Sequence, residues 1–214
     1  MKHIVFSGQL ANGKDVLADM VAEAFNRDLP VDDSVYWHRT AFAGAVKDIY
    51  CNAFGVDRDF IEKWKRHPEP PPGFLQTVRK SLQFIGDGFR QIQGDVWINI
   101  ALRGPRNVVI SDGRYINEAR AAHKLGGVNV LVWRPGFENN DPNLSEAQIL
   151  PIIRWCLDTN QNGPIVHSGD FDVEPVEGTE NYDYFFRNDV EMEQLRDKVK
   201  TELIPFLRDR YSGR

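Results

Sequence analysis

The sequence predicts an α/β protein in which a parallel β-sheet is covered by helices on both faces. Short apolar runs typical of buried strands recur along the chain, at 3–7, 107–112, 128–133 and 182–187. Segments with helical periodicity separate these runs, and the last of them, 191–211, is amphipathic. Because strands that alternate with helices are joined by crossover connections, we expect them to pair in parallel.

Composition places the chain among ordinary globular proteins. It has 214 residues, of which 42% are hydrophobic and 27% charged, and a formal net charge of −5. This length allows one domain, or one domain with a small insertion, and the negative charge argues against a protein that coats nucleic acid. No apolar run approaches a membrane span, and the chain does not begin with a basic segment followed by an apolar one. Cys51 and Cys156 lie outside any metal-binding motif, so we expect buried thiols in a cytoplasmic protein.

The stretch that follows the first strand is the most informative. Residues 8–14 read Gly-Gln-Leu-Ala-Asn-Gly-Lys, and a helical run, 15–25, begins directly after them. Strand, glycine-containing loop and helix therefore stand in the order of a phosphate-binding loop. Gly8 and Gly13 let the backbone wrap tightly, its N–H groups and the helix amino terminus point at phosphate, and Lys14 supplies a positive charge. The predicted loop consists of Gly8, Gln9, Leu10, Ala11, Asn12, Gly13 and Lys14.

The residue after the loop lysine departs from the general pattern. Ser or Thr normally stands there, and its hydroxyl ligates Mg²⁺. This chain has Asp15 followed by Val16, so no hydroxyl is available at this position. Asp15 is expected either to reach a metal, directly or through water, or to act as an electrostatic helix cap, and the sequence leaves both open.

A helical region with an uneven charge is expected between about 40 and 100. From Arg58 to Lys80, six basic residues stand against three acidic ones, so this segment is +3 and the remainder of the chain −8. Trp64, His67 and Phe74 are interleaved with these charges. Such a segment would suit a phosphate backbone and a stacked base. The alternative is a solvated helix followed by a rigid loop formed by the proline-rich residues 67–73.

A carboxylate ends the second clear strand. Asp112 closes the apolar run 107–112, and ligands of parallel sheets bind beyond the carboxyl ends of the strands. Asp112 is therefore a candidate for organising a metal ion in phosphoryl transfer, and its structural alternative is a helix cap. Arg114 follows two residues later and is placed to clamp an acceptor phosphate.

Further candidates lie beside loops or strand ends. Arg79, Arg90 and Arg134 have positions suited to phosphate ligands, although each is equally suited to a surface ion pair. Gln83 follows Arg79 by four residues, so the two share a helical face from which an amide would read a base edge. Phe42 begins a helix and is expected either to stack on a base or to pack in the core.

Several short motifs occur together in the order and spacing of one known family. They are residues 6–8 and 13–15, 42–43 with Lys47, 82–90 with Trp97, 111–118, 126–127, 145–146 and 188–189. On these motifs, which extend over nearly the full length, the chain resembles the phage-type deoxynucleoside monophosphate kinases and their relatives. The resemblance implies a P-loop kinase fold with a helical acceptor-binding insertion at about 40–100 and a small lid at about 134–150.

The resemblance also implies an ATP-dependent kinase that uses Mg²⁺. It suggests Lys14, Asp112, Arg114 and Arg90 for catalysis, with Asp15 and Asp112 at the metal. It suggests Arg134 and Asn188, besides the loop and Asp15, for ATP. The acceptor would be held by Phe42, Lys47, Arg79, Gln83, Asp87 and Arg90.

The acceptor is the open question. Gly113, Tyr115 and Ile116 occupy the variable places of a motif that in free-nucleotide enzymes usually resembles Asp-Val-Arg-Phe-Pro-Asn-Glu. A related group of phage enzymes resembles these kinases but phosphorylates 5-hydroxymethyldeoxyuridine already built into DNA, a step towards hypermodified thymidine. The +3 segment favours this DNA-directed activity, which for a phage protein would take place in the host cytoplasm. A free deoxynucleoside monophosphate, an acceptor of the dephospho-coenzyme A kinase type, and a non-catalytic nucleotide-binding module remain alternatives.

Overall fold

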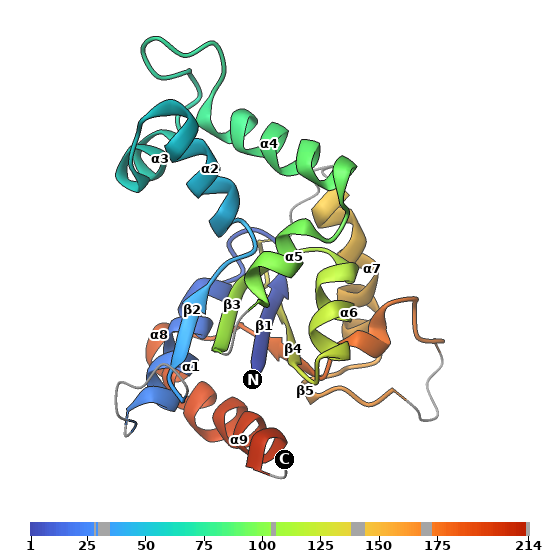
Figure 1. Ribbon diagram of the computed structural model, residues 1–214. Helices are drawn as coiled ribbons and strands as arrows, with labels where there is room; N and C mark the ends of the chain where they lie inside the picture. The colour runs from blue at the N-terminus through green and yellow to red at the C-terminus, as the bar shows by residue number, and fades with distance from the viewer. Residues whose placement is uncertain (28, 30–34, 104–105, 138–143, 168–172, 213–214) are drawn as a thin grey trace. The chain divides into compact units, whose positions relative to one another are not determined.

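The structure, a computed structural model, describes residues 1–27, 29, 35–103, 106–137, 144–167 and 173–212. The chain divides into two compact units (Figure 1). One comprises Met1–Thr40 together with Gly104–Arg214, and the other Ala41–Arg103. The second unit coincides with the helical region expected at about 40–100. None of the described helices is both long and apolar enough to cross a bilayer.

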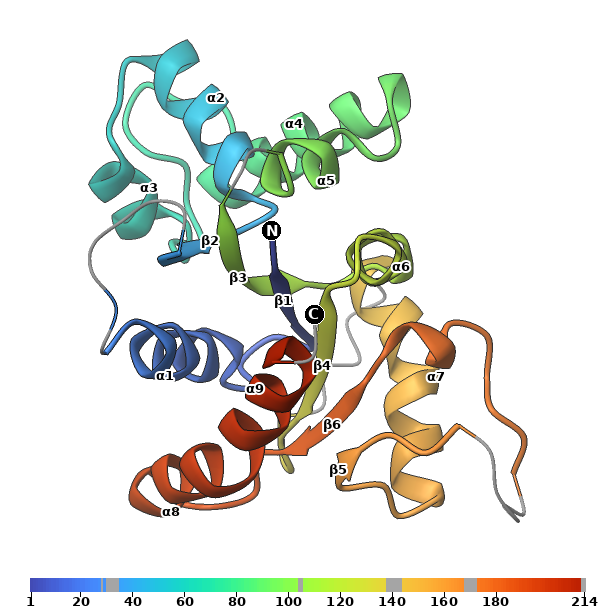
Figure 2. The same ribbon diagram turned by 60° about the horizontal axis from the view of Figure 1, so that its bottom comes forward.

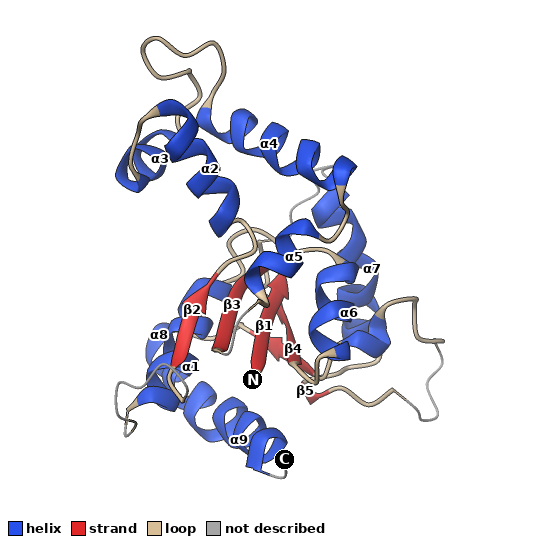
Figure 3. Ribbon diagram, viewed as in Figure 1, coloured by secondary structure: helices blue, strands red, loops and turns tan. Residues whose placement is uncertain are grey.

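A mostly parallel sheet forms the centre of the first unit (Figure 3). Among the described residues its six strands lie in the order β2 (Trp37–Thr40), β3 (Asn107–Gly113), β1 (His3–Gly8), β4 (Val128–Trp133), β6 (Tyr184–Arg187) and β5 (Gly163–Pro164). The first five strands pair in parallel, and β5 pairs antiparallel with β6 at the edge. The predicted α/β class with a parallel sheet is thus confirmed, apart from this two-residue edge strand.

Helices cover both faces of this sheet (Figure 2). On one face lie α1 (Lys14–Asn26), α8 (Met192–Lys198) and α9 (Ile204–Ser212), and on the other α6 (Ile116–Lys124) and α7 (Leu144–Asp158). Strand alternation explains the division, because successive side chains point to opposite faces. In β4, Val130 and Val132 belong to the core with α1 and α9, whereas Leu131 packs with Ile149 of α7.

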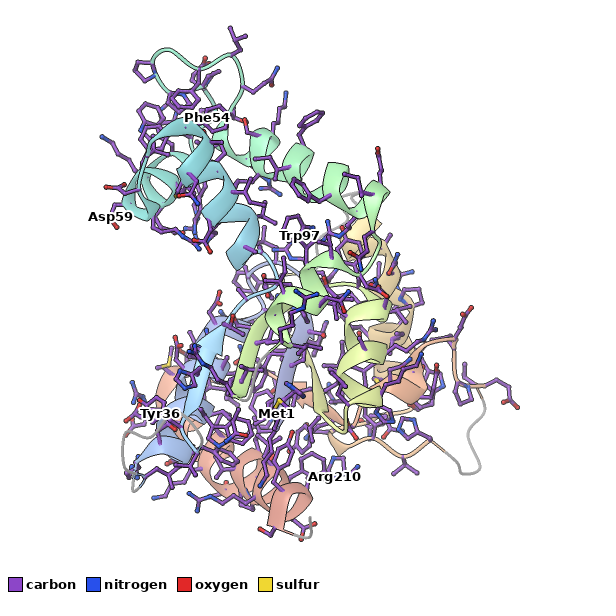
Figure 4. All side chains as sticks on the ribbon, viewed as in Figure 1. Met1, Tyr36, Phe54, Asp59, Trp97 and Arg210 are labelled. Atoms are coloured by element: carbon purple, nitrogen blue, oxygen red, sulfur yellow. The ribbon has the colours of Figure 1, made fainter. Side chains whose placement is uncertain are left out.

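The second unit is helical, with α2 (Gly44–Phe54), α3 (Arg58–Trp64), α4 (Val78–Ile92) and α5 (Val96–Ala101). Tyr50, Ile61 and Val78 form its buried core. The α2–α3 connection is set by Gly55, which ends α2 in the left-handed conformation, and by Asp57, which caps α3. Figure 4 labels Phe54 and Asp59 on either side of this connection.

Several predicted elements differ from the structure. The sequence did not indicate β2 or the two-residue edge strand at Gly163–Pro164. Although glycine and proline weaken helices, α4 continues through Gly86 and Gly88, and α7 continues through Pro151. The terminal helix expected at 191–211 comprises α8, a π-helical turn at Val199–Leu203 and α9.

Two of these differences have local causes. The carbonyl of Gly86 accepts a hydrogen bond of 3.0 Å from the indole Nε1 of the buried Trp97, which secures α4 at its glycines. The π turn ends two residues before Pro205, which lacks the backbone N–H that a regular helix needs.

The buried His3 predicts how stability depends on pH. His3 lies in β1 and is 3% exposed, and neither ring nitrogen has a hydrogen-bond partner among the described residues. Burial, with a smaller contribution from the positive amino terminus, lowers the pKa of His3 below its ordinary value. As the pH falls, His3 is therefore protonated at a higher pH in the unfolded chain than in the folded chain.

We expect the free energy of unfolding to fall as the pH drops below about 6.5, the ordinary histidine pKa, towards the lower folded-state value. Urea denaturation between pH 7.5 and 5 measures the free energy of unfolding. In the His3→Leu variant this free energy should change less with pH than in the wild type. His123→Asn, at an exposed site on α6, is the control. If the stability of His3→Leu depends on pH as that of the wild type does, His3 is not the cause of the dependence.

Candidate functional site

The glycine-containing loop joins the carboxyl end of β1 to the amino terminus of α1. Gly8 has φ +157°, and a Cβ there would lie 2.4 Å from the carbonyl oxygen of Val132. Gly13 has φ +87°, a left-handed conformation that side chains rarely adopt. Since β1 lies between β3 and β4, the loop is at the carboxyl edge of the sheet, where parallel sheets bind ligands.

Lys14 is the first residue of α1, and its side chain turns back over the loop. It is 7% exposed, and Nζ donates a hydrogen bond of 2.5 Å to the carbonyl oxygen of Gln9. A buried ammonium group in a loop at a helix amino terminus is suited to an anionic ligand, because both the helix dipole and the charge attract it.

Two buried asparagines fasten the loop to the sheet. The Nδ2 of Asn188, just beyond β6, donates to the carbonyl oxygen of Asn12 at 2.9 Å. Asn12 in turn donates through its own Nδ2 to the carbonyl oxygen of Val132 at 3.1 Å. Asn188 was predicted to bind ATP, and the structure places its amide behind the loop as a brace for the backbone.

We expect Asn188→Ala to loosen this loop. Loss of the amide leaves the buried carbonyl of Asn12 without that donor, which costs roughly 1–3 kcal/mol of folding free energy. Nucleotide affinity should fall about tenfold, because the loop amides are no longer held in place. Thermal denaturation and calorimetric titration with an ATP analogue measure the two effects. Asn162→Ala, at an exposed site, should change neither.

Asp15 is held in place by two side chains that the sequence did not single out. Its side chain is 82% exposed, and Oδ1 accepts a hydrogen bond of 2.6 Å from the hydroxyl of the buried Ser111. Arg39, at β2, lies 3.6 Å from the same oxygen and 2.6 Å from Asp19. A hydroxyl is thus present beside the position after Lys14, but it is contributed by β3.

Residues on either side of Asp112 contact the loop segment. Ser111 hydrogen bonds to Asp15, and Gly113 pairs with Ser7, which directly precedes Gly8. A Cβ on Gly113 would lie 2.4 Å from the Ser7 hydroxyl and 2.9 Å from a methyl group of Val5, so glycine is required there. Asp112 itself is half-buried, and the backbone around it is fixed beside the strand and helix that frame the loop.

Arg114 follows on the link to α6. Its backbone N–H donates to Glu118 Oε2 at 2.8 Å, and that of Tyr115 donates to the same oxygen at 3.1 Å. Glu118 is buried and so fixes the turn that carries Arg114. This contact accounts for the carboxylate that ends the 111–118 motif.

Arg134 lies just beyond β4, with its guanidinium 4.4 Å from the centre of the Phe137 ring. The pair is at the carboxyl edge of the sheet, where a stacked cation and ring suit a planar ligand. Of the lid expected at 134–150, residues 138–143 lie outside the described residues, and α7 begins at Leu144.

The predicted acceptor residues all lie in the second unit. Arg79, Gln83 and Arg90 share one face of α4, and Arg90 pairs with Asp87 at 3.2 Å. Lys47 of α2 is bound to Glu62 of α3 at 3.0 Å. Phe42 is buried, as a phenylalanine in the core would be.

The donor set at the carboxyl edge suits a weakly held Mg²⁺. The described residues contain no cluster of three or more His, Cys, Asp or Glu side chains arranged for a metal. Mg²⁺ typically takes one or two carboxylates and completes its shell with water and phosphate oxygens, which is what Asp15 and Asp112 offer.

No protein-family model matches the chain, and no curated protein sequence matches it significantly.

Proposed function

We propose that this protein is an ATP-dependent phosphotransferase of the P-loop kinase fold. The observation that carries the proposal is the loop at residues 8–14, with two glycines in conformations that side chains rarely adopt, its asparagine brace and the inward-turned Lys14. The central position of β1 in a parallel sheet supports it further, because the loop then opens at the edge where nucleotides bind.

In this proposal the loop amides and Lys14 bind the ATP phosphates, and Arg134 with Phe137 lies near the nucleotide. Asp112 and Asp15 would hold Mg²⁺, which when bound neutralises charge on the phosphates. Arg114 stabilises negative charge on the transferred group. An alcohol acceptor gives up a proton as it attacks, and Asp112 would accept that proton.

The proposed acceptor is 5-hydroxymethyldeoxyuridine within DNA. Its primary alcohol would receive the γ-phosphoryl group, and the modified base would leave the stack to do so unless the DNA is single-stranded. The excess of basic residues between Arg58 and Lys80 supports a polymer. The second candidate acceptor is a free deoxynucleoside monophosphate, which the stripe of Arg79, Gln83 and Arg90 favours.

Incubation with γ-labelled ATP and two acceptors in parallel tests the proposal. One acceptor is DNA that contains 5-hydroxymethyluracil, and the other is a mixture of free deoxynucleoside monophosphates. Label in the polymer alone is the expected result, and label in free diphosphates would move the proposal to the second acceptor. ATP binding without transfer to either acceptor would indicate a nucleotide-binding module.

A further inference from the structure

We infer that the outer face of α4, marked by Lys80 and Phe84, docks the single-stranded DNA that flanks the modified base. The inference rests on the proposed function, because it assigns a surface to the polymer part of that acceptor. It concerns residues outside the stripe of Arg79, Gln83 and Arg90, and it draws on the second unit alone.

The first step is the distribution of charge in this unit. Three carboxylates neutralise four of the basic side chains: Asp48 binds Arg58 at 2.5 Å, Asp87 binds Arg90, and Glu62 binds Lys47 and Lys65. By contrast, five cations of this unit have no ion-pair partner within the described part of the chain: Lys63, Arg66, Arg79, Lys80 and Arg103. All of them except Arg103 lie at the end of α3 and the start of α4, on both sides of the loop 67–77.

The second step is an aromatic ring in solvent. Phe84 is 81% exposed although it lies in the middle of a well-formed helix. Leu75, in the loop before α4, is 95% exposed. By contrast, the apolar side chains that hold α4 to the unit, Val78, Leu82 and Ile85, are buried or half-buried. Phe84 thus contributes little to the core of this unit.

The third step is the spacing of charge and ring. Lys80 precedes Phe84 by four residues, so the two side chains leave the same helical face with their Cβ atoms about 5–6 Å apart. Gly88, one turn further, adds no side chain to obstruct that face. Proteins that bind single-stranded nucleic acid combine cations along the backbone with aromatic rings on which bases stack. Negative phosphates complement the unpaired cations, whereas a second copy of this face would bring like charges together.

The test uses the full chain and two measurements. Fluorescence anisotropy gives the affinity for a labelled oligothymidine of about 12 nucleotides. Steady-state kinetics gives KM for DNA that contains 5-hydroxymethyluracil. We expect Phe84→Ala to weaken oligothymidine binding and to raise KM for DNA by about tenfold each. Lys80→Ala should reduce the slope of log affinity against log salt by about 0.7. KM for ATP should stay unchanged in both variants.

Matched substitutions at another exposed apolar–basic site are the controls. Leu125→Ala and Lys124→Ala, at the end of α6, remove the same kinds of group and should leave DNA binding as in the wild type. Since Phe84 is exposed, circular dichroism and the Tm of Phe84→Ala should match the wild type, so weaker binding reports the surface.

The outcomes separate this inference from the proposed function. If Phe84→Ala transfers phosphate to DNA with the wild-type KM for DNA, the docking surface is wrong and the proposed function is still supported. Oligothymidine binding that depends on Phe84, without transfer to any acceptor, supports the surface and overturns the function. A third outcome is that sedimentation reveals a wild-type dimer, which the Phe84→Ala substitution dissociates without changing oligothymidine binding. That result would assign this face to contact with a second copy of the chain and would contradict the inference.

Discussion

Lys14→Ala is expected to lower kcat for phosphate transfer by roughly a hundred- to a thousand-fold. The ammonium group lies within the loop, where Nζ donates to the carbonyl of Gln9. Bound phosphate offers the same donor a stronger, charge-assisted partner, and negative charge develops on the leaving oxygen between the β- and γ-phosphates as the reaction proceeds. Removal of the ammonium therefore affects the transition state more than the ground state, and kcat should fall more than KM for ATP rises.

Two further variants make this result specific. Lys14→Arg keeps the charge but replaces a point charge with a planar fork, so it should recover only a small part of the activity. Lys124→Ala removes an exposed lysine of the same unit and should have full activity. Because Lys14 is buried, the Tm of each variant is measured alongside the rate. A folded Lys14→Ala variant with intact phosphate transfer would contradict both kinase proposals.

The sequence predicted the loop well because its determinants are local. An apolar strand, two glycines, a lysine and an amphipathic helix follow one another within 25 residues, and each is recognisable without its neighbours in space. The carboxyl-edge position of Asp112 was predictable for the same reason, since it is the penultimate residue of a clear strand. These elements needed only periodicity and turn chemistry.

The parts that the sequence did not reveal depend on contacts between distant segments. Strand β2 is an edge strand in which only Trp37 is buried, so it lacks a continuous apolar signal. Without β2, Arg39 could not be placed beside Asp15 and Asp19. Ser111 was visible as the neighbour of Asp112, but its bond to Asp15 joins residues 96 positions apart.

The structure explains Gly113, one of the residues that differ from the motif usual in free-nucleotide enzymes. In the sequence it is only a small residue in a variable place of the motif. In the structure, a Cβ at this position would meet the side chains of Ser7 and Val5 so closely that these side chains would have to move. The glycine is therefore explained by packing, and it carries no information about the acceptor.

Asp112→Asn is expected to lower kcat by roughly a hundred- to a thousand-fold while ATP still binds. The residues on either side of Asp112 are fixed to the loop segment, Ser111 through Asp15 and Gly113 through Ser7. The amide has the size of the carboxylate but not its charge, so the backbone should stay in place while Mg²⁺ loses an anionic partner. The Mg²⁺ concentration that gives half-maximal activity should rise as well.

Asp19→Asn is the matched control, because it removes a carboxylate from α1 that pairs with Arg39 but lies one turn beyond Asp15. It should change kcat less than threefold, as expected for an exposed ion pair. The helix-cap alternative for Asp112 is wrong, because Asp112 lies within β3 and Tyr115 is the N-cap of α6. A purely structural role of Asp112 would give the opposite pattern, a lower Tm with kcat and Mg²⁺ dependence unchanged. Activity assays across a Mg²⁺ titration, read beside thermal denaturation, therefore separate a carboxylate that organises a metal from one that only stabilises the fold.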